Sequence, residues 1–241
     1  MSPRLEPQLH PWWPFSIHPH FMFEALGWLT GALVAFALRP KEDPAGGPVQ
    51  RQQVLVGAVL GGLVGAKGLF ALTDPAILAD PTQWLAGKSV VGALLGGWVG
   101  VEVAKQQAGI VSRTGDRFVW PLAIGIAVGR LGCFFSGVDD GTHGIVTASP
   151  FGMDLGDGQL RHPTALYEIP AVVGLAALAH ARPGPPGAVF RRWLGGYLAW
   201  RLLTEPLKTQ PIVGAGLTTI QWACGFGLAA LFIEAAMRRE R

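Results

Sequence analysis

The chain has 241 residues, of which 50% are apolar and 15% are charged, and its formal net charge is +3. This composition is that of a polytopic membrane protein, and the small positive charge does not indicate nucleic-acid binding. The two cysteines, Cys133 and Cys224, are too few to indicate a disulfide framework or a metal site, and we expect no metal and no cofactor.

Several apolar runs are long enough to cross a membrane. A hydrocarbon core about 30 Å thick needs roughly 20 apolar residues per helix. We expect spans near 21–38, 54–72, 87–104, 118–135, 165–181, 192–205 and 215–237. The third and the sixth are the weakest, because they are short or contain Arg201. The predicted fold is therefore all-α, with about seven transmembrane helices in a single integral membrane domain over residues 1–241.

The distribution of Lys and Arg predicts the orientation of these spans. The connections after the first, third and fifth spans and the C-terminal tail hold most of these residues, and cationic residues concentrate on the cytoplasmic side of membrane proteins. We therefore expect the N-terminus outside and the C-terminus in the cytoplasm. The cations of the predicted cytoplasmic side are Arg39, Lys41, Arg51, Lys105, Arg113, Arg117, Arg182, Arg191, Arg192, Arg238, Arg239 and Arg241.

Glycines recur at the spacing that lets two helices approach closely. They form rows along three predicted spans, and such rows indicate tight packing inside a bundle. The rows are Gly57, Gly61 and Gly65; Gly92, Gly96 and Gly100; and Gly125 and Gly129. No strong internal repeat is visible, which argues against an inverted-repeat transporter.

The most informative stretch follows the fourth span. Arg130 lies inside the apolar run Trp120–Phe135, and a polar loop with Asp139, Asp140 and His143 comes directly after it. An arginine at membrane depth costs a few kcal/mol and usually faces a partner, a polar cavity or an anionic ligand. The sequence offers Arg130 no obvious local partner, so we expect it to bind an anion. An Arg130 locked against a carboxylate in a closed, dry interior would contradict this expectation.

The outward loop Ser136–Pro163 ends in a second polar cluster. Thr164 is the predicted N-cap of the next helix, which places Arg161 and His162 at a helix N-terminus that favours anions. Tyr167 and Glu168 would point into the bundle just below. The alternative interpretation is a capped helix with snorkelling side chains.

Other ionisable residues lie in or near the spans. Arg201 and Glu205 are one helical turn apart, so the two charges either neutralise each other or serve the site. Lys67 lies near the predicted outer boundary and is a further cation. Glu24, with His20 before it, offers a counter-charge or a base, although an interfacial histidine with a satisfied hydrogen bond explains His20 equally well.

These segments together resemble the prolipoprotein diacylglyceryl transferase family. The resemblance is carried by the Gly-Arg-x-x-x-Phe segment at Gly129, by Ser149-Pro150-Phe151-Gly152-Met153-Asp154, by Arg161-His162-Pro163-Thr164-Ala165-Leu166-Tyr167-Glu168 and by Arg201-Leu202-Leu203-Thr204-Glu205-Pro206-Leu207-Lys208. The third string is the most specific, and Gly65-Ala66-Lys67 and Asp116 add weaker support. The family has seven helices with the same orientation as the charge distribution predicts.

The resemblance implies a reaction and its partners. Members transfer the diacylglyceryl group of phosphatidylglycerol to the lipobox cysteine of a prolipoprotein, releasing glycerol phosphate, at the outer face of the bacterial inner membrane. It therefore implies a multi-pass protein of that membrane, with phosphatidylglycerol, a lipobox peptide and membrane lipids as partners. It also assigns Arg130 to the phosphate, with Arg201 or Lys208 as a second cation, because such cations stabilise a leaving phosphate.

The chain departs from the family pattern at several positions. Gly141 keeps the family's glycine, but Cys133 stands at an asparagine position, and Val91 stands at the histidine that is a favoured general base. A replacement base is then expected to be His143, or His20 with Glu24, and Asp139 and Asp140 offer a carboxylate; the spacing of these residues does not select among them.

Two other functional classes compete with the transferase. A non-catalytic phospholipid-binding or assembly protein of the same fold would explain the missing histidine. A channel or transporter would need repeats and a continuous polar path, and the sequence shows no such symmetry.

Overall fold

The computed structural model describes residues 17–40, 45–73 and 87–239, and within them the chain is mostly helical. The long helices of this part are α1 (Pro19–Ala37), α2 (Pro48–Thr73), α4 (Val90–Gln107), α5 (Val119–Phe135), α6 (Thr164–His180), α7 (Ala188–Thr204) and α8 (Thr219–Arg239). Each corresponds to one of the predicted spans. Short helical turns occur at η2 (Asp116–Phe118), η3 (Gly137–Asp140) and η4 (Glu205–Leu207).

Four helices of the described chain are long and apolar enough to cross a membrane. They cover Pro19–Ala37, Pro48–Thr73, Asp116–Phe135 and Thr219–Met237. Helix α6 is apolar but shorter, and α4 and α7, which the sequence indicates as the weakest spans, are not among the four. The chain is thus a predominantly helical membrane protein, while seven crossings remain a prediction.

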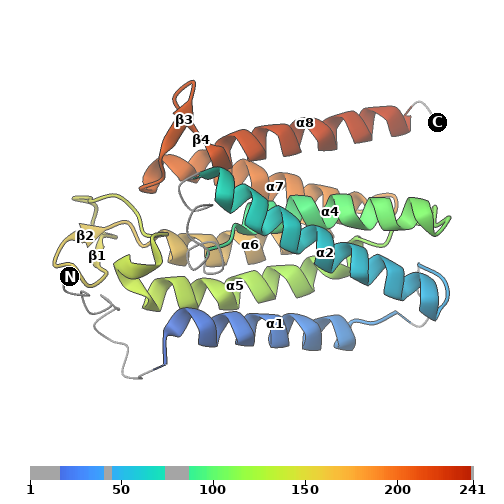
Figure 1. The fold of residues 1–241 in the computed structure, drawn as a ribbon, viewed down its shortest axis with the longest axis horizontal. Helices are drawn as coiled ribbons and strands as arrows, with labels where there is room; N and C mark the ends of the chain where they lie inside the picture. The colour runs from blue at the N-terminus through green and yellow to red at the C-terminus, as the bar shows by residue number, and fades with distance from the viewer. Residues whose placement is uncertain (1–16, 41–44, 74–86, 240–241) are drawn as a thin grey trace. The chain divides into compact units, whose positions relative to one another are not determined.

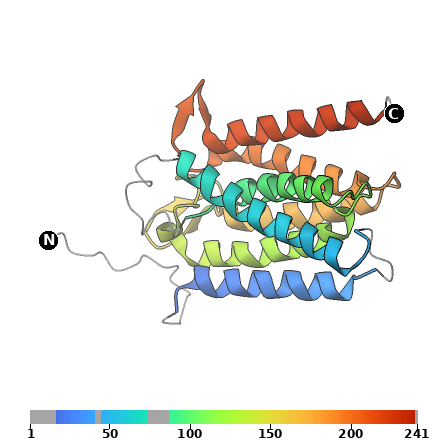
Figure 2. The same ribbon diagram turned by 45° about the vertical axis from the view of Figure 1, so that its right-hand side comes forward.

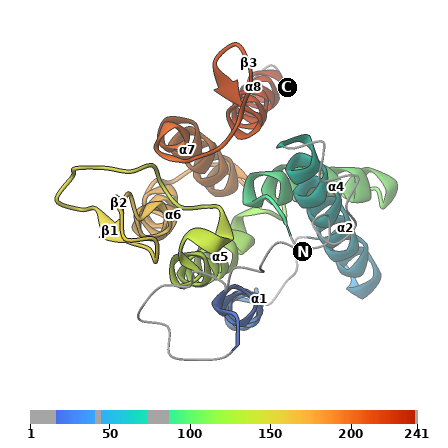
Figure 3. The same cartoon turned by 60° about the vertical axis from the view of Figure 1, so that its left-hand side comes forward.

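Residue contacts divide the chain into two units, and the single domain stays a prediction. Unit 1 comprises Met1–Leu38, Arg117–Ala181 and Pro206–Thr209, of which the structure describes the part from residue 17 onward. In this unit α1 lies along α5 (Figure 1) and α6 packs on α5 (Figure 3). The contact between α1 and α5 is close because glycines face it, as Gly27 lies against the backbone of Gly125.

Unit 2 comprises Arg39–Asp116, Arg182–Glu205 and Gln210–Arg241, again within the described residues. Helix α2 packs against α4, and α7 runs along α8 (Figure 2). The predicted glycine rows meet at the first of these contacts: a side chain at Gly61 would collide with the backbone of Gly96, and one at Gly65 with that of Gly92. The close-packing prediction for these two rows is therefore confirmed.

The helices begin at different kinds of caps. His18 caps α1 with Pro19 as its first residue, and the Ser89 hydroxyl caps α4 by accepting a hydrogen bond from Gly92 N. The prediction that Thr164 caps α6 is wrong. Helix α6 begins at Thr164 itself without a side-chain cap, because the Thr164 hydroxyl donates to the carbonyl of Thr142, 2.9 Å away.

Two small antiparallel hairpins complete the described chain. Strands β1 (Met153–Asp154) and β2 (Leu160–Arg161) pair within unit 1, and β3 (Ile212–Gly214) and β4 (Leu217–Thr218) pair within unit 2. The first hairpin is attached to the end of α5 by an apolar cluster of Cys133, Phe134, Leu155 and Ala165. This attachment fixes the outward loop against the two helices that carry the site.

Candidate functional site

The centre of the site is a buried cluster of three charged side chains in unit 1. Arg130 Nη2 lies 2.9 Å from Glu168 Oε1, and Lys208 Nζ lies 3.7 Å from Glu168 Oε2. Arg130 is 6% exposed, Glu168 1% and Lys208 8%. Helix α5 supplies the arginine from its last turns, helix α6 supplies the glutamate one turn after its start, and the chain after η4 supplies the lysine.

The sequence did not indicate that Arg130 pairs with Glu168, and this buried pair counts against the expectation that Arg130 is held for an anion alone. Removing charges from water costs several kcal/mol per ion, so a buried arginine needs such a carboxylate. A one-to-one pair would leave no charge for a ligand. Because Lys208 approaches the second oxygen of the same carboxylate, the three side chains together carry one net positive charge. Among these three side chains positive charge exceeds negative charge by one, and such an excess attracts an anion more strongly in a medium of low dielectric constant than in water.

Lys208 is held in place by backbone pairing with the outward loop. Gly144 and Lys208 form an antiparallel bridge, and Ile145 N donates to the carbonyl of Leu207 at 2.9 Å. On its other side, the same loop segment pairs with β2 and the residue after it: Gly144 N donates to His162 O at 3.1 Å, and His162 N donates to Ile145 O at 3.1 Å. The segment 144–147 thus lies between β2 and the chain at Lys208.

Arg161 and His162, which lie just before the Pro163 N-cap of α6, have different contacts. Arg161 donates from Nε and Nη2 to Asp157 Oδ2, at 2.9 and 2.8 Å, and from Nη1 to Gly144 O at 3.4 Å. His162 Nδ1 lies 3.2 Å from the Tyr167 hydroxyl. The predicted ligands Arg161, His162 and Tyr167 are therefore close to Glu168 in the sequence. The guanidinium of Arg161, however, is already paired with the carboxylate of Asp157, which the sequence does not indicate as its partner.

The predicted base candidates on α1 lie beside the end of α5. His20 Nε2 is 3.9 Å from Glu24 Oε2, and both side chains are about one quarter exposed, at 26% and 27%. A side chain at Gly132, two residues after Arg130, would contact the backbone of His20 and Pro19, so α1 touches α5 at this level. Phe23 stacks on Phe135 at a ring separation of 5.6 Å and fixes this packing.

The loop after α5 places the remaining predicted residues of unit 1. Gly141 ends η3 with a φ of 64°, a left-handed conformation that glycine adopts at little cost. His143 is half-buried and directly precedes Gly144, so the backbone that holds Lys208 also carries His143. Cys133, at the family's asparagine position, is a buried free thiol that accepts a hydrogen bond from Arg130 Nη1 at 3.5 Å.

The other predicted ligands belong to unit 2. Arg201 Nη2 and Glu205 Oε2 are 2.7 Å apart and both residues are buried, so the two side chains form the ion pair that their spacing allows. Lys67 Nζ donates to the carbonyl of Gly87 at 2.9 Å. Val91, where the resemblance places the family's histidine, is a fully buried apolar side chain in α4.

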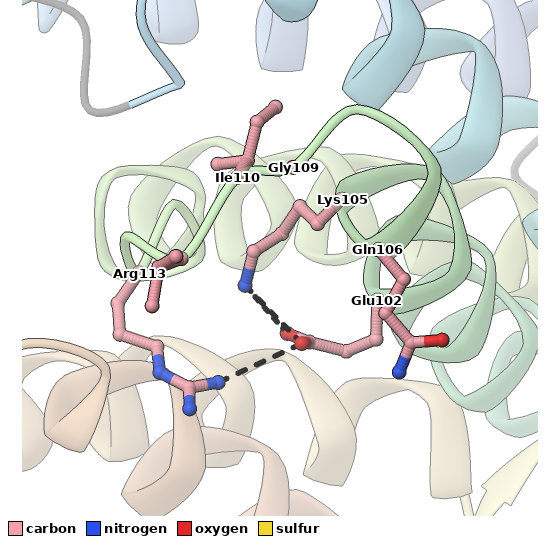
Figure 4. Close-up of a pocket in the computed structure, with 7 residues that line it drawn as sticks. Glu102, Lys105, Gln106, Gly109, Ile110 and Arg113 are labelled. Carbon is pink, nitrogen blue, oxygen red and sulfur yellow. Dashed lines mark hydrogen bonds and ion pairs between the residues drawn. The ribbon is translucent and has the colours of Figure 1, made fainter.

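Unit 2 also contains a cavity of about 340 Å³ at the C-terminal end of α4. Lys105 and Arg113 both turn toward the carboxylate of Glu102 (Figure 4), at 3.1 and 3.6 Å. Arg113 also lies 3.3 Å from Glu234. Two carboxylates therefore face the two cations, and this cavity, unlike the cluster in unit 1, has no excess positive charge among these four residues.

The sequence indicates most of these residues but not the contacts between them. Asp157 stands between two glycines, four positions before Arg161, a spacing that would have indicated a tight turn closed by an ion pair. The bridge between Gly144 and Lys208 joins segments that are far apart in the chain, and the sequence contains no local signal for it.

Comparisons with known proteins agree on one family. A family model described as prolipoprotein diacylglyceryl transferase matches residues 7–236. The phosphatidylglycerol–prolipoprotein diacylglyceryl transferase of Bordetella parapertussis is 29% identical, over 91% of this chain and 90% of the relative. The protein of that name from Vibrio vulnificus is 28% identical over 92% of each chain. The one from Legionella pneumophila strain Paris is 32% identical over 69% of this chain and 67% of the relative.

Proposed function

This chain belongs to the prolipoprotein diacylglyceryl transferase family, and we propose that it transfers the diacylglyceryl group of phosphatidylglycerol to a cysteine thiol of a prolipoprotein. Among this chain's own residues, the cluster of Arg130, Glu168 and Lys208 is the observation that supports the proposal. Its excess positive charge suits the phosphate of the lipid headgroup. Glu168 orients the guanidinium and is not itself a ligand of the anion.

In the proposed reaction, the thiol sulfur attacks the glyceryl carbon that carries the phosphate ester. A carbon–sulfur bond forms, the carbon–oxygen bond to phosphate breaks, and glycerol phosphate leaves with the bonding electrons. The thiol proton passes to a base, because a thiol of pKa near 8.5 is mostly protonated at neutral pH. Arg130 and Lys208 stabilise the charge that develops on the phosphate oxygens, which is largest in the transition state and the product.

The general base is proposed among residues near the end of α5. His143 precedes the segment that pairs with Lys208, and the His20–Glu24 pair lies on the part of α1 that packs against Gly132. The packing of Val91 in the core supports a base located elsewhere. The proposal predicts that His143→Ala or Glu24→Gln slows transfer without loss of the fold, and unchanged rates in both variants would eliminate these candidates.

The proposal also includes the arrangement in the membrane. Seven crossings with the N-terminus outside would place Arg130, Glu168 and Lys208 at the outer leaflet of the bacterial inner membrane, where a lipobox peptide would reach them. The agreement of the helix positions with the predicted spans supports this arrangement. Gly141, His162 and Tyr167 are proposed to line the lipid site beside the cluster. Lys67, Arg201 and Glu205, which belong to unit 2, stay predicted ligands on the basis of the sequence alone.

The decisive experiment combines the purified protein with phosphatidylglycerol and a peptide that contains a lipobox cysteine. We expect a diacylglyceryl thioether, detected by mass, together with released glycerol phosphate. A peptide whose cysteine is replaced by serine is the matched control and should remain unmodified. If folded protein yields no thioether while it still binds phosphatidylglycerol through Arg130, the chain is the non-catalytic lipid-binding protein instead.

A further inference from the structure

The hairpin β1–β2 contains an ion pair, Asp157–Arg161, that also contacts the backbone segment paired with Lys208. The guanidinium of Arg161 has all three of its nitrogens engaged: Nε and Nη2 contact Asp157 Oδ2, and Nη1 contacts the carbonyl of Gly144. The other oxygen of Asp157 accepts a hydrogen bond from Gln159 N at 3.3 Å. Arg161 therefore connects the turn of the hairpin to the backbone of the segment 144–147.

That segment determines where Lys208 lies. Gly144 is the residue that pairs with Lys208, and its neighbour Ile145 donates to Leu207. The fit allows no side chain at this position, because a Cβ on Gly144 would collide with His162 and lie 3.0 Å from Leu207 O. A shift of Gly144 would accordingly move Lys208, and Lys208 contacts the same carboxylate as Arg130.

We propose that Asp157 and Arg161 are positioning residues for the transfer reaction, which hold Gly144 and thereby fix Lys208 beside Glu168 and Arg130. The inference rests on the proposed function, and it revises the assignment of Arg161 as a ligand of the phospholipid. Asp157 acts on Arg161, Arg161 acts on the Gly144 carbonyl, and the paired backbone acts on Lys208. Neither Asp157 nor Arg161 touches the reacting atoms in this scheme.

The geometry supplies a matched pair of substitutions in one hairpin. Both carboxylate oxygens of Asp157 accept hydrogen bonds, so the amide of Asp157→Asn must turn its NH₂ group toward a donor. Asp154 accepts from Gly156 N and Gly158 N through Oδ1 alone, at 2.9 and 3.0 Å. An asparagine retains that oxygen, which makes Asp154→Asn the control.

The activity arm separates positioning from ligand binding. Asp157→Asn should lower kcat for transfer by about 10- to 100-fold, because small displacements of catalytic groups have effects of this size, and the KM for the lipobox peptide should stay unchanged. Arg161→Lys should behave like Asp157→Asn, since one ammonium nitrogen would replace the three separate nitrogens that contact Asp157 and Gly144. Asp154→Asn should retain wild-type activity. Wild-type kcat in Asp157→Asn, or in Arg161→Lys, would overturn the proposal.

A second experiment does not depend on catalysis, so it tests the positioning role of Asp157 and Arg161 separately from the proposed transfer function. Hydrogen exchange of the Gly144 and Ile145 amides should be slow in the wild type and in Asp154→Asn, and at least about tenfold faster in Asp157→Asn. Exchange in α5 should not change, which excludes general unfolding. Unchanged exchange at Gly144 and Ile145 would overturn the positioning role. If the wild type itself transfers nothing, the proposed function fails, and this exchange experiment still tests the connection from Asp157 to Lys208.

Discussion

The pairing of Arg130 with Glu168 explains how an arginine lies in an apolar helix. The carboxylate offsets part of the cost of burying the guanidinium, and Lys208 restores a positive excess. The sequence indicated Arg130, Glu168 and Lys208 separately, from their residue types and their motifs. It did not show that one carboxylate serves both cations, because the three residues come from segments far apart in the chain.

Substitution of Glu168 tests this account of the pair. Glu168→Gln leaves two buried cations without their shared counter-charge, so the free energy of unfolding should fall by about 3 kcal/mol. The measurement is denaturant or thermal unfolding in detergent, with Glu24→Gln, at a partly exposed pair, as a comparison that should change much less. Equal stability of Glu168→Gln and the wild type would show that the pair is not buried as described.

The titration of Asp157 supplies a pH-dependent prediction. The guanidinium of Arg161, which donates two hydrogen bonds, holds the pKa of Asp157 below its ordinary value. Because the folded-state pKa lies below the unfolded-state pKa, the carboxylate stabilises the fold above about pH 4, and the contribution is lost as the pH falls through the folded-state pKa. The Tm difference between the wild type and Asp157→Asn should therefore stay constant from about pH 7 to pH 5. A difference that disappears within that range would contradict the lowered pKa.

At the scale of helices, local signals in the sequence were sufficient to locate the elements. Apolar runs predicted α1, α2 and α4 through α8, and the glycine rows predicted the close contact between α2 and α4. The start of α6 was predicted wrongly because the Thr164 hydroxyl has a tertiary acceptor, Thr142 O, in place of a local amide. The hairpin β1–β2 was not predicted either, since its strands are only two residues long.

The glycine contact between α2 and α4 predicts that glycine-to-alanine substitutions at two positions of α2 have opposite effects on the free energy of unfolding. Gly61→Ala places a methyl group against the backbone of Gly96, so it should lower the free energy of unfolding by about 1–3 kcal/mol. Gly68→Ala on the same helix meets nothing within 4 Å and should stabilise the protein by up to about 1 kcal/mol. Unfolding of the two variants in detergent measures both effects. Equal changes in the two would mean that the glycine rows do not form the contact.

At the scale of the whole molecule, the charge distribution predicts which ends of the helices face the cytoplasm. Arg113 is expected on the cytoplasmic side, together with Lys105 and Glu102. Phe151 lies in the outward loop, is 72% exposed and is expected on the outer side. A single cysteine introduced at Ser149 should react with a membrane-impermeant thiol reagent in intact cells, whereas one at Ser112 should react only after lysis. Because Cys133 and Cys224 are buried, they should add little background. Reversed labelling would contradict the orientation.

The central claim is that Arg130, oriented by Glu168, binds the phosphate of the transferred lipid's headgroup. The most direct measurement is the affinity of the purified protein for phosphatidylglycerol, by native mass spectrometry, in the wild type, in Arg130→Ala and in Arg39→Ala, which removes an exposed cation. Loss of a charge-assisted hydrogen bond should weaken binding by at least about tenfold in Arg130→Ala, with no loss in Arg39→Ala. If Arg130→Ala binds phosphatidylglycerol as tightly as the wild type, the claim is wrong.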